Sequence, residues 1–312
     1  MNEAIPFVFE PIFKDYVWGG EKLISIKKAK GISKIAESWE ISDRKEGESR
    51  VSLGKHKGKT IRNLIEEGLL GEKFTRYPLL IKLIDAKENL SIQVHPDEKS
   101  AKKLGAEPKT EMWYVLDAEA GAAVYAGFSP DSTLKQRQES LGKKEILSTL
   151  RKIPVKKGDI IYIPGGRVHA ILQGCFLLEV QQNSNTTYRI YDWDRNDPNR
   201  ALHLKEGKEV IHFEDIQTPL CTPKLQEKTE EYRKFLGVKT PYFEIRKYQL
   251  KGSMELSLQE GMKALFLIEG KASYQDQGKR VFLDPFRAYL FPKGEKKAKL
   301  EGKATLISVV HK

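Results

Sequence analysis

A short strand-like segment carries two side chains that divalent metals bind. Gln93 and His95 are two positions apart in Leu-Ser-Ile-Gln-Val-His, so both point to the same face of a strand. A buried amide or imidazole costs several kcal/mol when it has no partner. We therefore expect either a hydrogen-bonded pair in the core or two ligands of one metal ion.

Two further candidates lie on later segments. Glu111 begins the apolar run Glu-Met-Trp-Tyr-Val-Leu, where an unpaired carboxylate would also be costly. His169 ends residues 158–169, which have the spacing G-x5-P-x-G-x2-H of the second half of the cupin signature. The asparagine that usually follows four residues later is Gln173 here. Alternation along the return strand turns His169 inward.

These four residues form a ligand set of nitrogen and oxygen donors without thiolate. Such a set suits zinc and also manganese, iron or cobalt. The chain has two cysteines, Cys175 and Cys221, and we expect both to be reduced thiols. A set that contains an amide oxygen and no cysteine is poor for a structural zinc site and leaves room for substrate oxygens. The predicted metal ligands are Gln93, His95, Glu111 and His169.

The elements that would position these ligands are mainly strands. Alternating apolar runs separated by glycine turns predict an all-β protein with two cupin or jelly-roll β-barrel units and a small helical insertion in the first. Helices are expected at residues 60–70, with Thr60 as N-cap, at 96–104, and in the insertion at about 129–152. The segment around residues 220–240, up to Pro241, contains two prolines and a charge run, which predicts a loose connection.

The predicted domains are a catalytic cupin domain, residues 1–237, and a degenerate cupin-like domain, residues 238–312. A weak internal repeat supports the second. Superimposing Pro164 on Pro292 places Gly166 on Gly294. His169 then falls on Lys297, so the second copy keeps the turn and lacks the imidazole.

The chain has 312 residues and a net charge of +11. Its lysines alternate with glutamates along the whole sequence, a pattern typical of solvated faces, so we expect no nucleic-acid partner. The positive charge would attract an anionic small molecule. No stretch approaches about 18 apolar residues, and the opening residues lack the pattern of a signal peptide. We expect a cytoplasmic protein without a membrane partner, as a monomer or weak dimer.

Four segments together resemble one enzyme family. PLLIKLIDAKENLSIQVHPD (78–97), KTEMWYVL (109–116), PGGRVHAI (164–171) and LEVQQNSNTTYRIYDW (178–193) are similar to type I phosphomannose isomerases of the short bacterial class. The resemblance implies an aldose–ketose isomerase that interconverts mannose 6-phosphate and fructose 6-phosphate by proton transfer through an enediol. It also implies one zinc ion per chain, held by the four ligands above.

The same resemblance implies roles for six other residues. Lys109, Glu179 and Arg189 are expected to be catalytic, whereas Lys82, Trp18 and Asn185 are expected to bind the sugar phosphate. Segments 18–20 and 37–40 are also similar to family segments that line the cavity. Family members often carry an aspartate at the position of Asn185, which weakens an acid or base role there.

Three other functions stay open on the sequence alone. One is another metal-dependent cupin enzyme, either a different sugar isomerase or a dioxygenase, although dioxygenases usually present His-x-His where this chain has Gln93-x-His95. Another is a non-catalytic cupin that binds a sugar phosphate, for which Asn185 is the one hint. A third, a nucleic-acid-binding protein, rests on the charge alone.

Overall fold

The structure, a computed structural model, describes residues 5–276 and 278–312. Strands dominate the described residues and form three large sheets and a two-stranded ribbon. The chain divides into two compact units that are not consecutive in sequence. Unit 1 comprises Met1–Ile12, Trp39–Ile81 and Cys221–Lys312, and unit 2 comprises Phe13–Ser38 and Lys82–Leu220.

Unit 2 is built on two sheets that share one apolar core. The first has the order β10-β9-β12-β7-β14, and the second has the order β15-β11-β8-β13-β6-β3-β2. Four strands begin in one unit and end in the other, because a boundary between the units falls within each of them: β2, β3, β6 and β15. The bounds are β2 (Ile12–Lys14), β3 (Glu37–Ile41), β6 (Leu79–Ala86), β7 (Ile92–Val94), β8 (Glu111–Ala118), β9 (Ala123–Phe128), β10 (Leu150–Pro154), β11 (Ile160–Ile163), β12 (His169–Ile171), β13 (Cys175–Gln182), β14 (Tyr188–Tyr191) and β15 (Leu220–Cys221).

Alternation along the strands decides which side chains enter this core. Trp113 of β8, Val124 of β9 and Ile171 of β12 belong to one buried cluster between the sheets. Ile92 and Val94 of β7 belong to a different cluster, on the outer face of the five-stranded sheet. Gln93, which lies between Ile92 and Val94, must therefore point inward, so a polar side chain lies in the space between the sheets.

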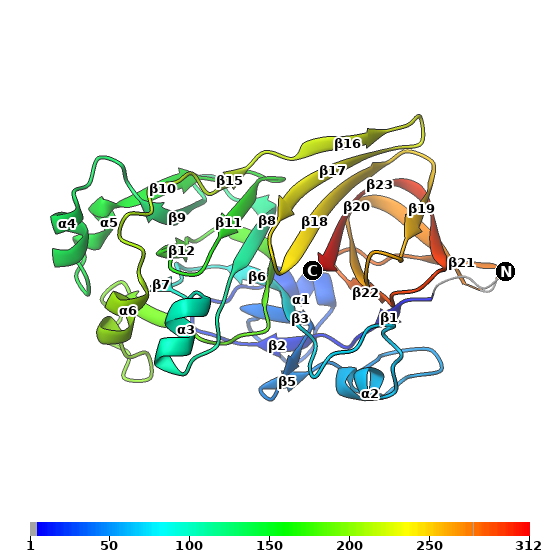
Figure 1. The fold of residues 1–312 in the computed structure, drawn as a ribbon, viewed down its shortest axis with the longest axis horizontal. Helices are drawn as coiled ribbons and strands as arrows, with labels where there is room; N and C mark the ends of the chain where they lie inside the picture. The colour runs from blue at the N-terminus through cyan, green and yellow to red at the C-terminus, as the bar shows by residue number, and fades with distance from the viewer. Residues whose placement is uncertain (1–4, 277) are drawn as a thin grey trace. The chain divides into compact units, whose positions relative to one another are not determined.

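Helices of unit 2 cover that outer face. Ile146 and Val210, from two of them, pack in the same cluster as the outward residues of β7. The helix expected at 96–104 is present and begins at Asp97, whose Oδ1 accepts a 2.7 Å hydrogen bond from the Ser100 N–H. Helices α3 and α6 lie beside each other (Figure 1). The bounds are α1 (Lys22–Lys27), α3 (Glu98–Leu104), α4 (Leu134–Glu139), α5 (Ile146–Thr149) and α6 (Leu204–Val210), with α4 and α5 inside the expected insertion.

Unit 1 contains a nine-stranded sheet whose main path is β1-β22-β20-β23-β18-β17-β16, with β19 on β23 and β21 on β20. Tyr248, Leu265 and Leu306 belong to its buried core. Helix α2 (Ile61–Glu66) begins at Thr60, as expected. The strands are β1 (Phe7–Val8), β4 (Asp43–Arg44), β5 (Gly47–Glu48), β16 (Lys224–Lys228), β17 (Tyr232–Lys239), β18 (Phe243–Leu250), β19 (Ser253–Ser257), β20 (Lys263–Asp276), β21 (Lys279–Phe282), β22 (Ala288–Phe291) and β23 (Lys297–His311).

The loose connection predicted for residues 220–240 is wrong. Strands β16 and β17 occupy this segment and run side by side with β18 as an antiparallel ribbon (Figure 1). Every residue of β16 is exposed, so backbone pairing rather than an apolar face holds the strand. The boundary drawn between residues 237 and 238 lies within β17. The division into domains 1–237 and 238–312 otherwise stays a prediction.

None of the helices in the described residues combines the length and apolar character needed to cross a bilayer.

Candidate metal centre and active site

The four predicted ligands come together inside unit 2. Strands β7 and β12 pair so that His169 lies opposite Gln93. His95 directly follows β7, and Glu111 begins β8 on the other sheet. One ligand atom from each of His95, Glu111 and His169 lies within 4.8 Å of the others, and all three residues are buried. The structure therefore brings three candidate metal ligands together, with the Gln93 amide beside them.

The Pro-Gly-Gly turn before β12 requires glycine at both positions. A Cβ on Gly165 would lie 2.6 Å from the Asp97 Cα, and Gly166 has a φ of +88°. The Gly166 N–H donates to the His95 carbonyl over 2.8 Å. This bond fixes the segment that precedes His169 against the segment that carries His95.

Hydrogen bonds fix the tautomer of both imidazoles. The His95 Nδ1 lies 2.9 Å from the Thr186 carbonyl oxygen, and the His169 Nδ1 lies 2.9 Å from the Arg167 carbonyl oxygen. A carbonyl oxygen only accepts, so each Nδ1 carries the hydrogen and each Nε2 presents a lone pair. Burial, and after it the charge of Lys109, lowers the pKa of His95 to about 3; burial likewise lowers the pKa of His169. Both rings are therefore neutral near pH 7.

These lone pairs face a carboxylate. The Nε2 atoms of His95 and His169 lie 3.5 Å and 3.4 Å from the two carboxylate oxygens of Glu111. The His95 Nε2 and both Glu111 oxygens are buried without a hydrogen-bond partner in the described residues, although the Lys109 ammonium approaches one oxygen to 3.1 Å. Such an arrangement of acceptors is repulsive unless a cation lies among them. The residues present therefore fit a divalent metal ion.

Gln93 completes this donor set. Its amide nitrogen lies 3.3 Å from the His169 Nε2, and its oxygen accepts a 3.2 Å hydrogen bond from the Ser91 hydroxyl. The oxygen and nitrogen of an amide have nearly the same shape, and a half-turn about the last side-chain bond exchanges them. That rotation would direct the amide oxygen to the cluster.

A row of buried charges lies next to the cluster. The Lys82 ammonium is 3.0 Å from Glu37 Oε1 and 3.0 Å from Glu179 Oε1. Burial alone lowers the pKa of Lys82, but the charges of Glu179 and Glu37 outweigh burial and raise it. Burial, and then the charge of Glu111, raises the pKa of Glu179. Trp113 Nε1 donates to Glu179 Oε2 over 2.8 Å. The two carboxylates thus stabilise Lys82 as an ammonium group, which is unsuited to act as a base.

We expect Lys82→Met to destabilise the fold by about 3–5 kcal/mol, because it leaves Glu37 and Glu179 buried without their cation. Chemical unfolding of the variant and the wild type measures the difference. Adding Glu37→Gln to Lys82→Met should recover part of the loss. Lys22→Met, which breaks an exposed pair with Asp117, should cost less than about 1 kcal/mol. Equal losses for the exposed and buried lysines would contradict this account.

A cavity of about 290 Å³ opens beside the cluster within unit 2. It is lined by every predicted catalytic and substrate-binding residue, and by Gln93 among the predicted ligands. The sequence did not single out Tyr16, Ser91, Thr187 or Arg200, which also line it. Alternation from Gln93 could have found Ser91, whereas Arg200 follows a segment without regular periodicity. The predicted residues at the cavity are Trp18, Lys82, Gln93, Lys109, Glu179, Asn185 and Arg189.

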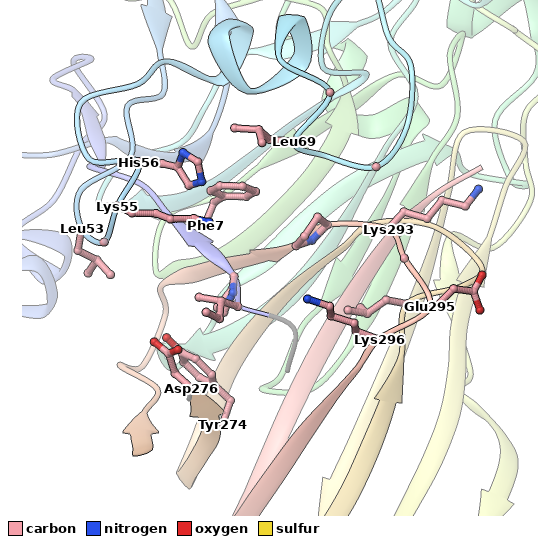
Figure 2. Close-up of a pocket in the computed structure, with 18 residues that line it drawn as sticks. Phe7, Leu53, Lys55, His56, Leu69, Tyr274, Asp276, Lys293, Glu295 and Lys296 are labelled. Carbon is pink, nitrogen blue, oxygen red and sulfur yellow. The ribbon is translucent and has the colours of Figure 1, made fainter. Parts of the chain in front are cut away.

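A larger cavity, of about 750 Å³, lies in unit 1 and contains none of these residues (Figure 2). The rings of Phe7 and His56 lie side by side in its wall, with centroids 5.6 Å apart, and Tyr274 and Asp276 form another part (Figure 2). Although this cavity is larger, we do not assign the catalytic centre to it, because none of the described residues places a cluster of candidate metal ligands or buried charges in its wall.

The two-sheet core with an inward cluster of candidate metal ligands, two histidines and a glutamate, defines unit 2 as a β-barrel of the cupin type. Comparison with known proteins identifies the family. Residues 7–145 match the model of the phosphomannose isomerase type I catalytic domain, and residues 233–311 match that of the mannose-6-phosphate isomerase cupin domain. The chain belongs to the type I phosphomannose isomerase family, and the predicted family and all-β cupin fold are confirmed.

The similarity to individual relatives extends over nearly the whole chain. Mannose-6-phosphate isomerase ManA of Bacillus subtilis is 36% identical over 313 residues, covering 97% of this chain and 98% of the relative. Mannose-6-phosphate isomerase of Streptococcus mutans is 36% identical over 264 residues, covering 81% of each chain. A crystal structure of the mannose 6-phosphate isomerase from Bacillus subtilis superposes with a TM-score of 0.88 at 32% identity, covering 98% of this chain and 99% of that one.

Proposed function

We propose that the chain is a zinc-dependent isomerase that interconverts mannose 6-phosphate and fructose 6-phosphate. Family membership supports the reaction. The observation that carries the proposal is the convergence of two neutral imidazole lone pairs and the Glu111 carboxylate on one buried point. One zinc ion per chain suits this donor set of nitrogen and oxygen without thiolate. When bound, it would supply Lewis-acid stabilisation of negative charge that develops on the substrate oxygens.

The side chains around the cavity suggest how the proton moves. Isomerisation through an enediol needs a base that takes a proton from one carbon and returns it to the next. Lys109 is the first candidate, because it lines the cavity and its side-chain nitrogen lies 3.1 Å from Glu111. To act as the base it must first give up its ammonium proton. Glu179 is the second, although Lys82 and Trp113 already occupy its two oxygens. Lys82 would place a fixed positive charge near the enediolate.

The remaining candidates would bind and orient the sugar. Arg189, predicted to be catalytic, lies opposite Gln93 on β14 and lines the cavity. Trp18 offers an aromatic wall, and Asn185 offers an amide rather than the aspartate frequent in the family. The cytoplasmic location, the monomeric or weakly dimeric state and the lack of nucleic-acid or membrane partners stay predictions.

The test is a coupled assay that follows fructose 6-phosphate formed from mannose 6-phosphate, together with analysis of the bound metal. We expect about one zinc per chain. A chelator should abolish turnover, and added Zn²⁺ should restore it because the ligands are already positioned. Magnesium, which prefers an octahedral shell of oxygen ligands, should not restore turnover.

Two other results would replace the proposal. Zinc and sugar-phosphate binding without any fructose 6-phosphate would identify a non-catalytic binding protein. Oxygen uptake without isomerisation would identify a dioxygenase.

A further inference from the structure

The cavity in unit 2 is lined by carboxylates, lysines and arginines. Near the metal cluster, three buried carboxylates face two lysines, so protein charge there is negative before any cation binds. Two arginines, Arg189 and Arg200, line the same cavity. A substrate that carries its own negative charge at one end would therefore be oriented by this cavity.

Arg189 is a desolvated cation without a carboxylate. One of its terminal nitrogens, Nη1, donates to the Ala201 carbonyl over 2.9 Å, and its Nε is buried without a partner in the described residues. Burial lowers the pKa of Arg189, and the charge of Arg200 lowers it further. A buried donor without a partner in a half-buried cationic side chain is costly unless an anion arrives.

Asp192 holds the Arg200 guanidinium in place and leaves one of its nitrogens, Nη1, free. Its Nε and Nη2 donate to the two oxygens of Asp192 over 2.7 Å and 3.1 Å, so that Nη1 has no hydrogen bond within residues 5–276 and 278–312. Burial would raise the pKa of Asp192, but Arg200 and then Arg195 lower it, so the carboxylate stays charged. Arg195 binds the same carboxylate over 2.9 Å and the Asn89 carbonyl over 2.7 Å.

We propose that Arg200, together with Arg189, binds the phosphate of the substrate and that Arg200 makes the enzyme selective for phosphorylated sugars. Two guanidinium groups in the wall of one cavity match a phosphate dianion, because each offers planar donors to its oxygens. The sugar carbons that react then lie toward the metal cluster. This inference rests on the proposed isomerase function.

The experiment compares Arg200→Ala with the wild type on mannose 6-phosphate and on unphosphorylated mannose, using the zinc-loaded enzyme. We expect kcat/KM for mannose 6-phosphate to fall about 100-fold, as for the loss of a strong charge-assisted hydrogen bond. The value for mannose should stay within about threefold, because mannose has no group to meet Arg200. Arg200→Lys should lose less, since it keeps the charge but not the planar fork.

Inhibition by inorganic phosphate gives a second measurement that does not need turnover of mannose. Its inhibition constant against mannose 6-phosphate should rise at least about tenfold in Arg200→Ala. Arg195→Ala is the matched control, because Arg195 holds the same Asp192 but does not line the cavity. It should leave both the inhibition constant and the substrate preference unchanged.

Several outcomes would overturn the assignment. An equal loss of kcat/KM on both sugars would do so, and so would an unchanged inhibition constant for inorganic phosphate. An equal effect in Arg195→Ala would mean that Arg200 is only a structural partner of Asp192. A wild type that does not isomerise mannose 6-phosphate would instead refute the proposed function. Calorimetric titration of the wild type and Arg200→Ala with inorganic phosphate would still test the binding site, and equal affinities would reject it.

Discussion

Replacement of His169 with alanine is expected to remove the metal ion and to reduce isomerase turnover at least about a thousandfold. The residue supplies one of the two lone pairs that face Glu111, and its partner Gln93 loses the neighbour that orients it. Loss of Lewis-acid stabilisation removes several kcal/mol, and each 1.36 kcal/mol corresponds to about a factor of ten in rate. Metal analysis by mass spectrometry and the coupled assay measure both effects on the same preparation.

A matched control separates metal loss from general damage. His56→Ala removes an imidazole from the wall of the unit 1 cavity, so it should retain a full zinc content and normal turnover. Circular dichroism of His169→Ala should show the strand content of the wild type. Retention of zinc and turnover by His169→Ala would disprove the ligand assignment, and with it the basis of the metal mechanism.

Lys109→Met is expected to lower kcat by about 10²–10⁴-fold while zinc stays bound, because a general base contributes about that factor. The side chain reaches the predicted metal ligand Glu111 but is not among the predicted ligands. Methionine keeps the length of the apolar stem and removes the nitrogen. Steady-state kinetics with metal analysis of each preparation measures the change.

Glu179→Gln is the comparison that decides between the two candidate bases. If Lys109 moves the proton, Glu179→Gln should lose less in kcat, since its carboxylate mainly compensates Lys82. A larger loss in Glu179→Gln than in Lys109→Met would transfer the base role to Glu179. Normal turnover of zinc-loaded Lys109→Met would remove Lys109 from the proton path.

The inner face of unit 2 was predictable because strand alternation is strict. Spacing alone placed Gln93 on the face opposite Ile92 and Val94, and the structure shows those two in the outer cluster. The Pro-Gly-Gly turn likewise predicted the place where His169 begins a strand. Both inferences depend on neighbours within a few residues, which is the range over which sequence periodicity operates.

Contacts between distant segments were not predictable in the same way. Lys82 pairs with Glu37 and Glu179, which lie 45 and 97 positions away, and no local pattern shows that these three charges share one core. Arg200 lies in an irregular segment whose course is set by Asp192. Strand β16 was missed because Leu225 is its one apolar residue, which leaves no apolar face to recognise.

That same strand has a consequence for how copies of the protein meet. β16 is the last strand on the main path of its sheet, and an edge strand offers backbone groups to another chain. If two copies paired antiparallel about Gln226, Lys224 of each would stand opposite Lys228 of the other. Repulsion between like charges directly across such a ladder disfavours it. In this register the sequence Lys-Leu-Gln-Glu-Lys therefore opposes self-association through the open edge of the sheet.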